Sequence, residues 1–282
     1  MRTSAESWPQ GPDVPSASPA PSGRNAMRRK FVKQLRCARA VLLALMVTRT
    51  AHAQEWAFGV RGGPSIPRLS GGGNEVSRGY SSILALNFGL VAERSFSSGF
   101  SVLAEVDYSG QGGKRRGLQP VTQDLPLPPP QGGQYYYADF TNRSELDYLE
   151  IPILAKYEWP LSASWRLFAE AGPYVGYLLK GQEKTSGTSP IYDNYGQGLV
   201  AITPPVSFDA TTNVRGDLNK FNAGVMAGIG VAYLLGRRDE VYVDVRGEYG
   251  LTAVQKNTAQ NGRSNTGSAT LLLGYKHSFG GG

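Results

Sequence analysis

The chain has 282 residues, of which 29 are Lys or Arg and 22 are Asp or Glu, so its formal net charge is +7. This length allows one large β domain or two ordinary domains. The positive excess lies in the first 53 residues, which hold nine of the basic and two of the acidic side chains. The remaining chain has 20 of each sign, and this balance excludes a basic nucleic-acid-binding protein.

Residues 27–53 have the order of a secretory signal peptide. A basic stretch at 28–39 precedes a short apolar run at 40–47, and Ala51-His52-Ala53 offers a cleavage site. The apolar run is too short for a membrane-spanning helix, which needs roughly 20 residues. The only cysteine, Cys37, lies in this leader, so the exported chain is expected to have no disulfide and no cysteine metal site.

Residues 1–26 are rich in Pro, Ser and Ala and show no periodicity, which predicts disorder. Since a signal peptide should start a chain, we favour a translation start at Met27 over a true N-terminal extension. Residues 54–282 are then expected to form the mature domain.

The mature chain contains eight segments with strand character, rich in β-branched and aromatic residues. They lie near 55–64, 81–95, 99–112, 146–159, 164–180, 220–235, 239–251 and 268–279. Short turns join the second to the third, the fourth to the fifth and the sixth to the seventh, whereas the joins near 65–80, 113–144, 181–219 and 252–267 are long. Short turns at one end and long loops at the other are typical of a transmembrane β-barrel. The predicted fold is all-β, an eight-stranded antiparallel up-and-down transmembrane barrel.

Apolar and polar residues alternate along these strands. In "LDYLEIPILAKYEW", 146–159, Leu149, Ile151 and Ile153 share one face and the charged residues lie between the apolar ones. Alternation alone also fits a lipocalin-like barrel, with the apolar face inside. Three features favour a barrel whose apolar face contacts lipid. They are the mixed charges of the polar face, the long loops at one end and the aromatics at strand ends. Those aromatics are Trp56, Phe96, Trp159, Trp165, Tyr233 and Phe279.

The charged residues of the polar face are expected to pair inside the barrel, because unpaired charges there are costly. The basic ones are Arg61, Lys156, Arg166, Lys180, Arg246 and Lys276, and the acidic ones are Glu93, Glu105, Asp107, Glu150, Glu158, Glu170, Asp244 and Glu248. An eight-stranded barrel is just wide enough for its own side chains, which predicts a plugged interior without an open pore. We interpret the charges as structural; a proton or ion path is the alternative.

No catalytic, cofactor-binding or metal-binding set stands out. The single histidine of the mature chain, His277, adjoins Ser278, but neighbouring strand residues face opposite ways, which disfavours a Ser–His hydrolase. "GIGVAY", 228–233, lacks the third glycine of a dinucleotide loop. The expected protein is not an enzyme and needs no cofactor.

The strongest loop feature is "YYYADF", 135–140, with Tyr135, Tyr136, Tyr137 and Phe140. These aromatics are suited either to contact with a protein or glycan partner or to capping of the barrel rim.

Four segments together resemble the PorT-like outer-membrane β-barrel family: 59–72, 146–159, 168–181 and 245–251. The resemblance covers about 54–279 and implies a small barrel that the barrel-assembly machinery inserts into the bacterial outer membrane. The founding member takes part in a type IX protein-secretion system. The resulting hypothesis is a structural or interaction role, exercised through the long extracellular loops near 113–144 and 181–219. The alternatives are a secretion-system accessory, a narrow porin and a soluble lipocalin-like binder.

Overall fold

The computed structural model describes residues 55–96, 99–122, 125–194 and 198–279. The predicted extension 1–26 and signal peptide 27–53 lie outside the described residues. Among those described, no helix is long and apolar enough to cross a membrane.

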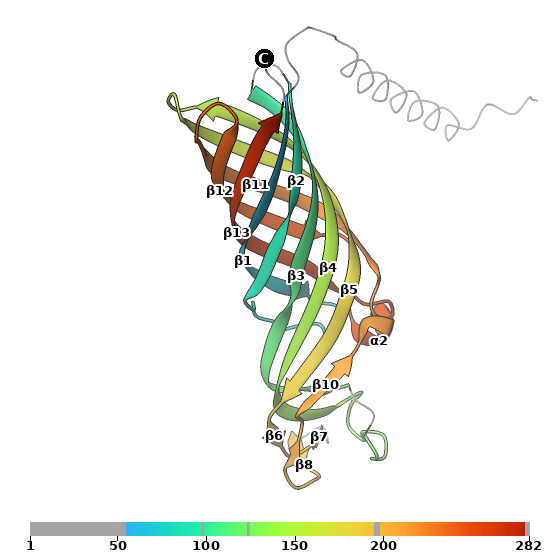
Figure 1. Cartoon of the computed structure of the whole chain (residues 1–282). Coiled ribbons are helices and arrows are strands. Elements are labelled where there is room, and N and C mark those ends of the chain that lie inside the picture. The colour runs from blue at the N-terminus through green and yellow to red at the C-terminus, as the bar shows by residue number, and fades with distance from the viewer. Residues whose placement is uncertain (1–54, 97–98, 123–124, 195–197, 280–282) are drawn as a thin grey trace, which may run out of the picture. The chain divides into compact units, whose positions relative to one another are not determined.

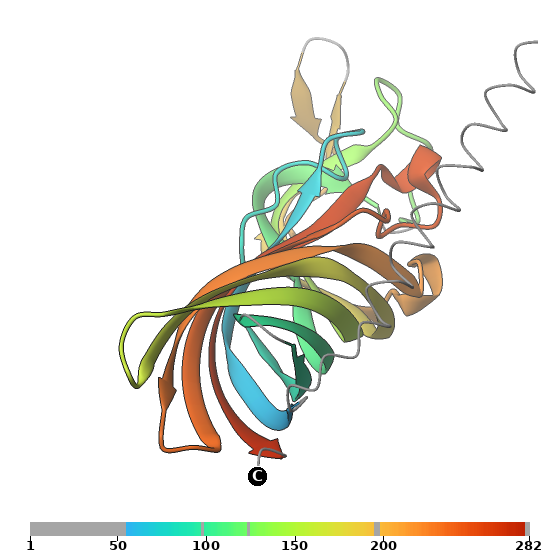
Figure 2. The same ribbon diagram turned by 90° about the horizontal axis from the view of Figure 1, so that it is seen from above.

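Eight long antiparallel strands close into a ring, which confirms the predicted barrel (Figures 1 and 2). Neighbouring strands in the ring follow the chain order, and the last strand pairs with the first from Trp56↔Phe279 to Gly71↔Ser264. The ring strands are β1 (Trp56–Gly71), β2 (Ala85–Ser95), β3 (Phe100–Val121), β4 (Tyr136–Pro160), β5 (Trp165–Ser186), β11 (Phe221–Leu234), β12 (Asp239–Gly250) and β13 (Ser264–Phe279).

The outer face of the ring is apolar, and aromatics border it at both ends. Its middle exposes Ile151, Ile153, Ile229 and Val245 among other aliphatic side chains. Near the short turns lie the expected aromatics, with Trp165 and Tyr233 rings 4.9 Å apart. At the other end the outward pairs are Phe88–Tyr108 and Tyr177–Phe221, at 4.8 and 5.4 Å. Two aromatic girdles around an apolar belt are what a lipid-facing barrel requires.

β3, β4 and β5 are longer than predicted, at 22, 25 and 22 residues. The prediction that 113–144 is one long loop was wrong, because β3 and β4 stay paired from Gly112↔Glu145 to Val121↔Tyr136. Only residues 122–135 connect them. In Figure 1 these strands continue beyond the ring on the side of the long joins, which is the extracellular side of outer-membrane barrels.

Short elements complete this extracellular part. After β5 the chain forms β10 (Ala210–Asn213), which pairs with β5. It also forms β6 (Thr188–Ser189), β7 (Tyr192–Asn194), β8 (Leu199–Ala201), β9 (Val206–Ser207) and the 3₁₀ turn η2 (Arg215–Asp217). The helix α2 (Thr258–Asn261) precedes β13. β6 and β9 pair with each other in a separate two-stranded sheet. We call the extended ends of β3, β4 and β5, with β7, β8, β10 and this small sheet, the extracellular sheet.

Candidate functional site

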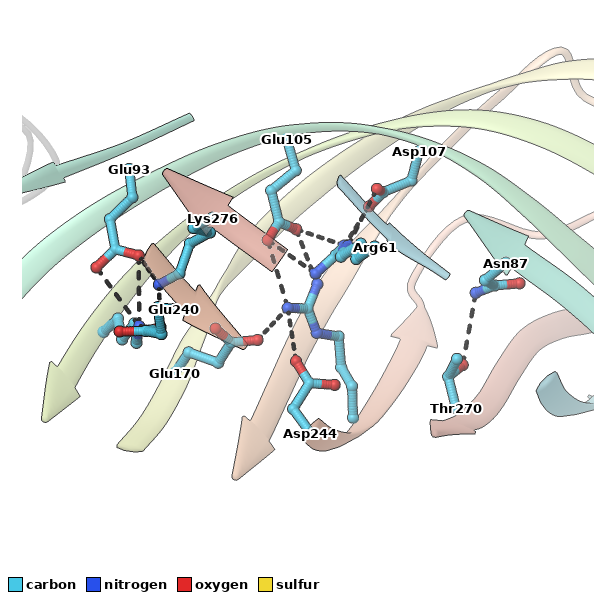
Figure 3. Close-up of polar contacts among 12 residues, drawn as sticks. Arg61, Asn87, Glu93, Glu105, Asp107, Glu170, Glu240, Asp244, Thr270 and Lys276 are labelled. Carbon is cyan, nitrogen blue, oxygen red and sulfur yellow. Dashed lines mark hydrogen bonds and ion pairs between the residues drawn. The ribbon is translucent and has the colours of Figure 1, made fainter. Parts of the chain in front are cut away.

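The middle of the barrel holds a cluster of buried charges that come from four strands. Arg61 on β1 donates from both Nη atoms to the Glu105 carboxylate on β3, at 2.8 and 2.6 Å, and also bonds Asp107. Glu105 is only 1% exposed. Because strand residues two apart face the same way, Glu105 and Asp107 both reach this guanidinium. Figure 3 shows the three side chains meeting inside the ring.

Arg246 on β12 continues the cluster from the other side of Glu105. Its Nη1 donates to Glu105 Oε2 at 2.8 Å, and its Nη2 contacts Glu170 on β5 and Asp244 on its own strand. Glu105 thus lies between two guanidinium groups and joins β1, β3 and β12 through one carboxylate. We call Arg61, Glu105, Asp107, Glu170, Asp244 and Arg246 the central cluster.

A second cluster lies toward the short turns and is built on two lysines. Lys276 contacts Glu93 and Glu240, at 2.5 and 2.7 Å, and Lys156 contacts Glu158 and Glu93, at 2.5 and 3.3 Å. Arg166 bonds Glu158 at 2.9 Å, but 42% of its side chain is exposed, so it lies at the rim rather than in the lumen. The sequence interpretation missed Glu240, although it shares a face with Tyr242 and Asp244 by the period-2 rule.

Glycines on β11 give room for aromatic side chains beside the lysine cluster. A Cβ added at Gly230 would lie 2.4 Å from Phe168 Cζ and 2.5 Å from the Val243 carbonyl oxygen, whereas at Gly228 the shortest contact would be 3.3 Å. Gly230→Ala is therefore expected to destabilise the barrel by about 1–3 kcal/mol through overpacking. Gly228→Ala is the matched control, and urea unfolding of both variants in lipid checks the difference. Equal midpoints for the two variants would contradict the expectation.

Glu150 and Glu248 also lie inside, but neither forms a salt bridge with a described residue. Glu248 accepts from Gln111, and Glu150 Oε1 is buried without a hydrogen-bond partner. Both line a hollow of about 10 Å³ together with Arg61 and Asp107. This volume holds about one water molecule, so it is no passage for solutes.

The extracellular mouth of the barrel is closed by apolar side chains. Leu69, Leu146, Tyr148, Leu178, Leu218 and Val254 form one buried cluster there. Together with the two charge clusters it fills the lumen, in agreement with the width of an eight-stranded barrel.

Lys180 lies on the outer face, and its predicted place in the lumen was wrong. A β-bulge between Asp147 and Tyr148 shifts the register of β4 and β5, so that Tyr148 pairs with Leu178 but Asp147 with Lys180. Asp147 lies two residues before the outward-facing Leu149 on β4, so it also points outward. Its cross-strand partner Lys180 lies on the same face and therefore points outward as well. One extra residue reverses the alternation of β5 beyond that point.

The loop aromatics divide between a core and a surface. Tyr136 and Phe140 are buried with Val121, Ala138, Ile191 and Phe208 in a core of the extracellular sheet. Tyr135 and Tyr137 are half-buried; their hydroxyls donate to the Gln260 carbonyl and to Glu75 Oε2, at 3.3 and 2.7 Å. The bond to Glu75 raises the pKa of Tyr137 to about 12.

The described residues do not assemble a catalytic or metal-binding set around His277. Its Nδ1 lies 2.8 Å from Asp239 Oδ1 at the short-turn end, and its ring packs edge-on against Phe279. No group of three or more His, Cys, Asp and Glu side chains in this part of the chain is arranged to hold a metal ion.

A closed ring of eight strands with an apolar belt outside and paired charges inside defines a small transmembrane β-barrel. The chain belongs to the family of the outer membrane protein beta-barrel domain, whose model matches residues 52–255. The protein is therefore a small β-barrel of the outer membrane, and the soluble lipocalin-like alternative was wrong.

Several solved outer-membrane barrels are similar to the chain. Neisserial surface protein A is 12% identical, with 79% of this chain and 99% of that chain covered and a TM-score of 0.38. Ail of Yersinia pestis is 12% identical, with 80% and 99% covered and a TM-score of 0.33. OprG of Pseudomonas aeruginosa is 10% identical, with 79% and 95% covered and a TM-score of 0.34. No curated protein matches the sequence significantly.

Proposed function

We propose that the protein has a non-enzymatic structural or interaction role, in which the barrel anchors the extracellular sheet as a contact surface. The observation that carries this proposal is the buried core of the sheet, outside the ring. Phe140 and Phe208 stack there at 4.8 Å, and the Gln119 amide donates to the Phe140 carbonyl at 2.6 Å. A loop that only joined two strands would not need such a core, whose buried apolar contacts stabilise the sheet locally.

The surface of this sheet and of the segments beside it offers two features suited to a partner. The β7–β8 hairpin exposes Leu199 and Val200, at 38% and 52%. A second feature is a hollow of about 310 Å³, lined by Tyr135, Pro129, Gln260 and neighbouring residues, and none of the described residues that line it is charged. Apolar and aromatic groups beside a few amides are the usual lining of sites for proteins or neutral glycans.

The alternative of a narrow porin has less support, since charge clusters and an apolar cluster fill the described lumen. The alternative of a secretion-system accessory, and membership of the PorT-like group, rest on the sequence resemblance. Such an accessory would copurify with other outer-membrane components, and its contacts need not involve the extracellular sheet.

Site-specific photo-crosslinking in intact cells tests the proposal. A crosslinking amino acid at Leu199 probes the sheet, and one at Leu161, an exposed leucine in the turn between β4 and β5, is the matched control. We expect a discrete crosslinked species from Leu199 that Val200→Asp abolishes without loss of the folded barrel. Crosslinks from Leu161 alone would place the interface at the opposite end and overturn the proposed role of the sheet.

A further inference from the structure

A group of basic side chains lies where the outer aromatic girdle ends. Tyr177 on β5 and Phe221 on β11 are direct cross-strand partners that point to the lipid, and Phe221 is 70% exposed. Aromatic side chains of this kind mark the level at which acyl chains give way to polar headgroups. Charged groups next to this pair, on its extracellular side, are thus at headgroup level.

Arg215 of η2 is held against this pair. Its guanidinium carbon lies 5.8 Å from the centre of the Tyr177 ring, and its Nε and Nη2 donate to the Leu178 carbonyl at 3.1 and 3.0 Å. Nη2 also donates to the Tyr177 hydroxyl at 3.3 Å. All these partners are uncharged, so within the described residues the positive charge of Arg215 has no carboxylate in contact.

Two lysines flank the same segment of β5. The Lys220 carbonyl accepts from the Leu178 amide at 2.7 Å, and the Lys220 side chain is exposed. Lys180 follows two residues along β5, and the bulge described above turns it outward. Like Arg215, neither lysine forms a salt bridge with a described residue. By contrast, Lys184 and Arg143 farther along the same face both pair with Glu145, at 2.8 Å.

The surrounding charges leave the group positive. Lys256 Nζ donates to the Gly216 carbonyl, which adds a fourth cation beside η2. Of the described carboxylates on β4 and η2 beside the group, Asp147 lies opposite Lys180 in register, Asp217 lies two residues after Arg215, and Glu145 already pairs with Lys184 and Arg143. The four cations Arg215, Lys180, Lys220 and Lys256 outnumber the two remaining carboxylates, Asp147 and Asp217.

We propose that Arg215, Lys180 and Lys220 bind the phosphate group of a lipid in the outer leaflet of the outer membrane. A guanidinium and ammonium groups that form no salt bridge with a described residue supply charge-assisted donors to a phosphate. The adjoining Tyr177 and Phe221 contact acyl chains at the same place, which a soluble anion cannot use. This site is independent of the proposed partner of the extracellular sheet, and either can fail alone.

Native mass spectrometry of the folded full chain in detergent tests the site, with bisphosphorylated lipid A as the probe. Dephosphorylated lipid A and inorganic phosphate are the comparison ligands. Arg215→Gln with Lys220→Gln removes two charges from the site, and Arg237→Gln with Arg238→Gln removes two from the turn between β11 and β12 as a control. The single variant Lys220→Gln is included because loss of Arg215 could also disturb η2. The Lys220 side chain bonds no described residue, so its replacement tests the site and leaves η2 unchanged.

We expect the double variant at the site to bind bisphosphorylated lipid A about tenfold more weakly, and Lys220→Gln alone to weaken it severalfold. The control variant should bind as the parent does, and dephosphorylated lipid A should bind weakly to all. Equal binding of the two lipids, or equal losses in site and control variants, would overturn the proposal. Full displacement of the lipid by inorganic phosphate would also overturn it and indicate a site for soluble anions.

Discussion

Glu105→Gln is expected to destabilise the folded barrel by about 3 kcal/mol, the largest effect of any single lumen carboxylate. The reason is that Glu105 contacts both Arg61 and Arg246, so its loss leaves two buried guanidinium groups short of one partner. Breaking a buried ion pair from one side typically costs about 3–5 kcal/mol. We expect the lower end of this range, because Asp107, Glu170 and Asp244 still contact the two arginines.

Glu150→Gln is the matched control for this experiment. Glu150 and Glu105 are both 1% exposed, but Glu150 forms no salt bridge with a described residue. Its replacement by a neutral isostere breaks no salt bridge with a described residue and is expected to leave stability unchanged or raised. The measurement is a urea titration in lipid vesicles, read as the change in gel mobility between unheated folded barrel and heated chain. Equal losses in the two variants would show that burial rather than pairing sets the cost.

Much of the ring and most of its lumen could be predicted from the sequence, because strand alternation is a local property. Once the strand near 239–251 is recognised, Asp244, Arg246 and Glu248 must share a face. The pairing partners could not be predicted in this way, since they depend on register. Arg61 and Glu105 lie on strands that are not neighbours in the ring, and only the closed barrel brings them together.

The errors have local physical causes. The alternation pattern places Lys180 in the lumen, because a β-bulge of one residue does not show in such a pattern. The sequence predicts a loop where the extended end of β3 lies, because 113–121 contains glycines, three consecutive basic residues and a proline, all poor strand formers. Its strands form because long-range partners such as Ile191 and Phe208 bury Tyr136 and Phe140, and such partners lie outside any local window.

The second large effect is expected from a charge placed on the outer apolar face of the barrel, which we assign to lipid. Ile229→Arg places a charge near the middle of β11 on the face that we assign to lipid, where the residue is 55% exposed in the isolated chain. An arginine at the bilayer midplane of a barrel costs about 2–4 kcal/mol, whereas near the interface it costs about 0–1 kcal/mol. A soluble barrel with the same exposure would tolerate the arginine, because water would solvate it.

Leu235→Arg is the control, since Leu235 is 56% exposed but follows the last residue of β11 at the short-turn end. We expect Ile229→Arg to lower the unfolding free energy in lipid vesicles by about 2–4 kcal/mol and Leu235→Arg by at most about 1 kcal/mol. Because Ile229 and Leu235 are equally exposed, accessible area alone predicts the same loss of unfolding free energy for both variants. Unequal losses would therefore identify depth in the membrane as the cause. If the two variants unfold at the same urea concentration, the apolar belt does not face lipid at Ile229.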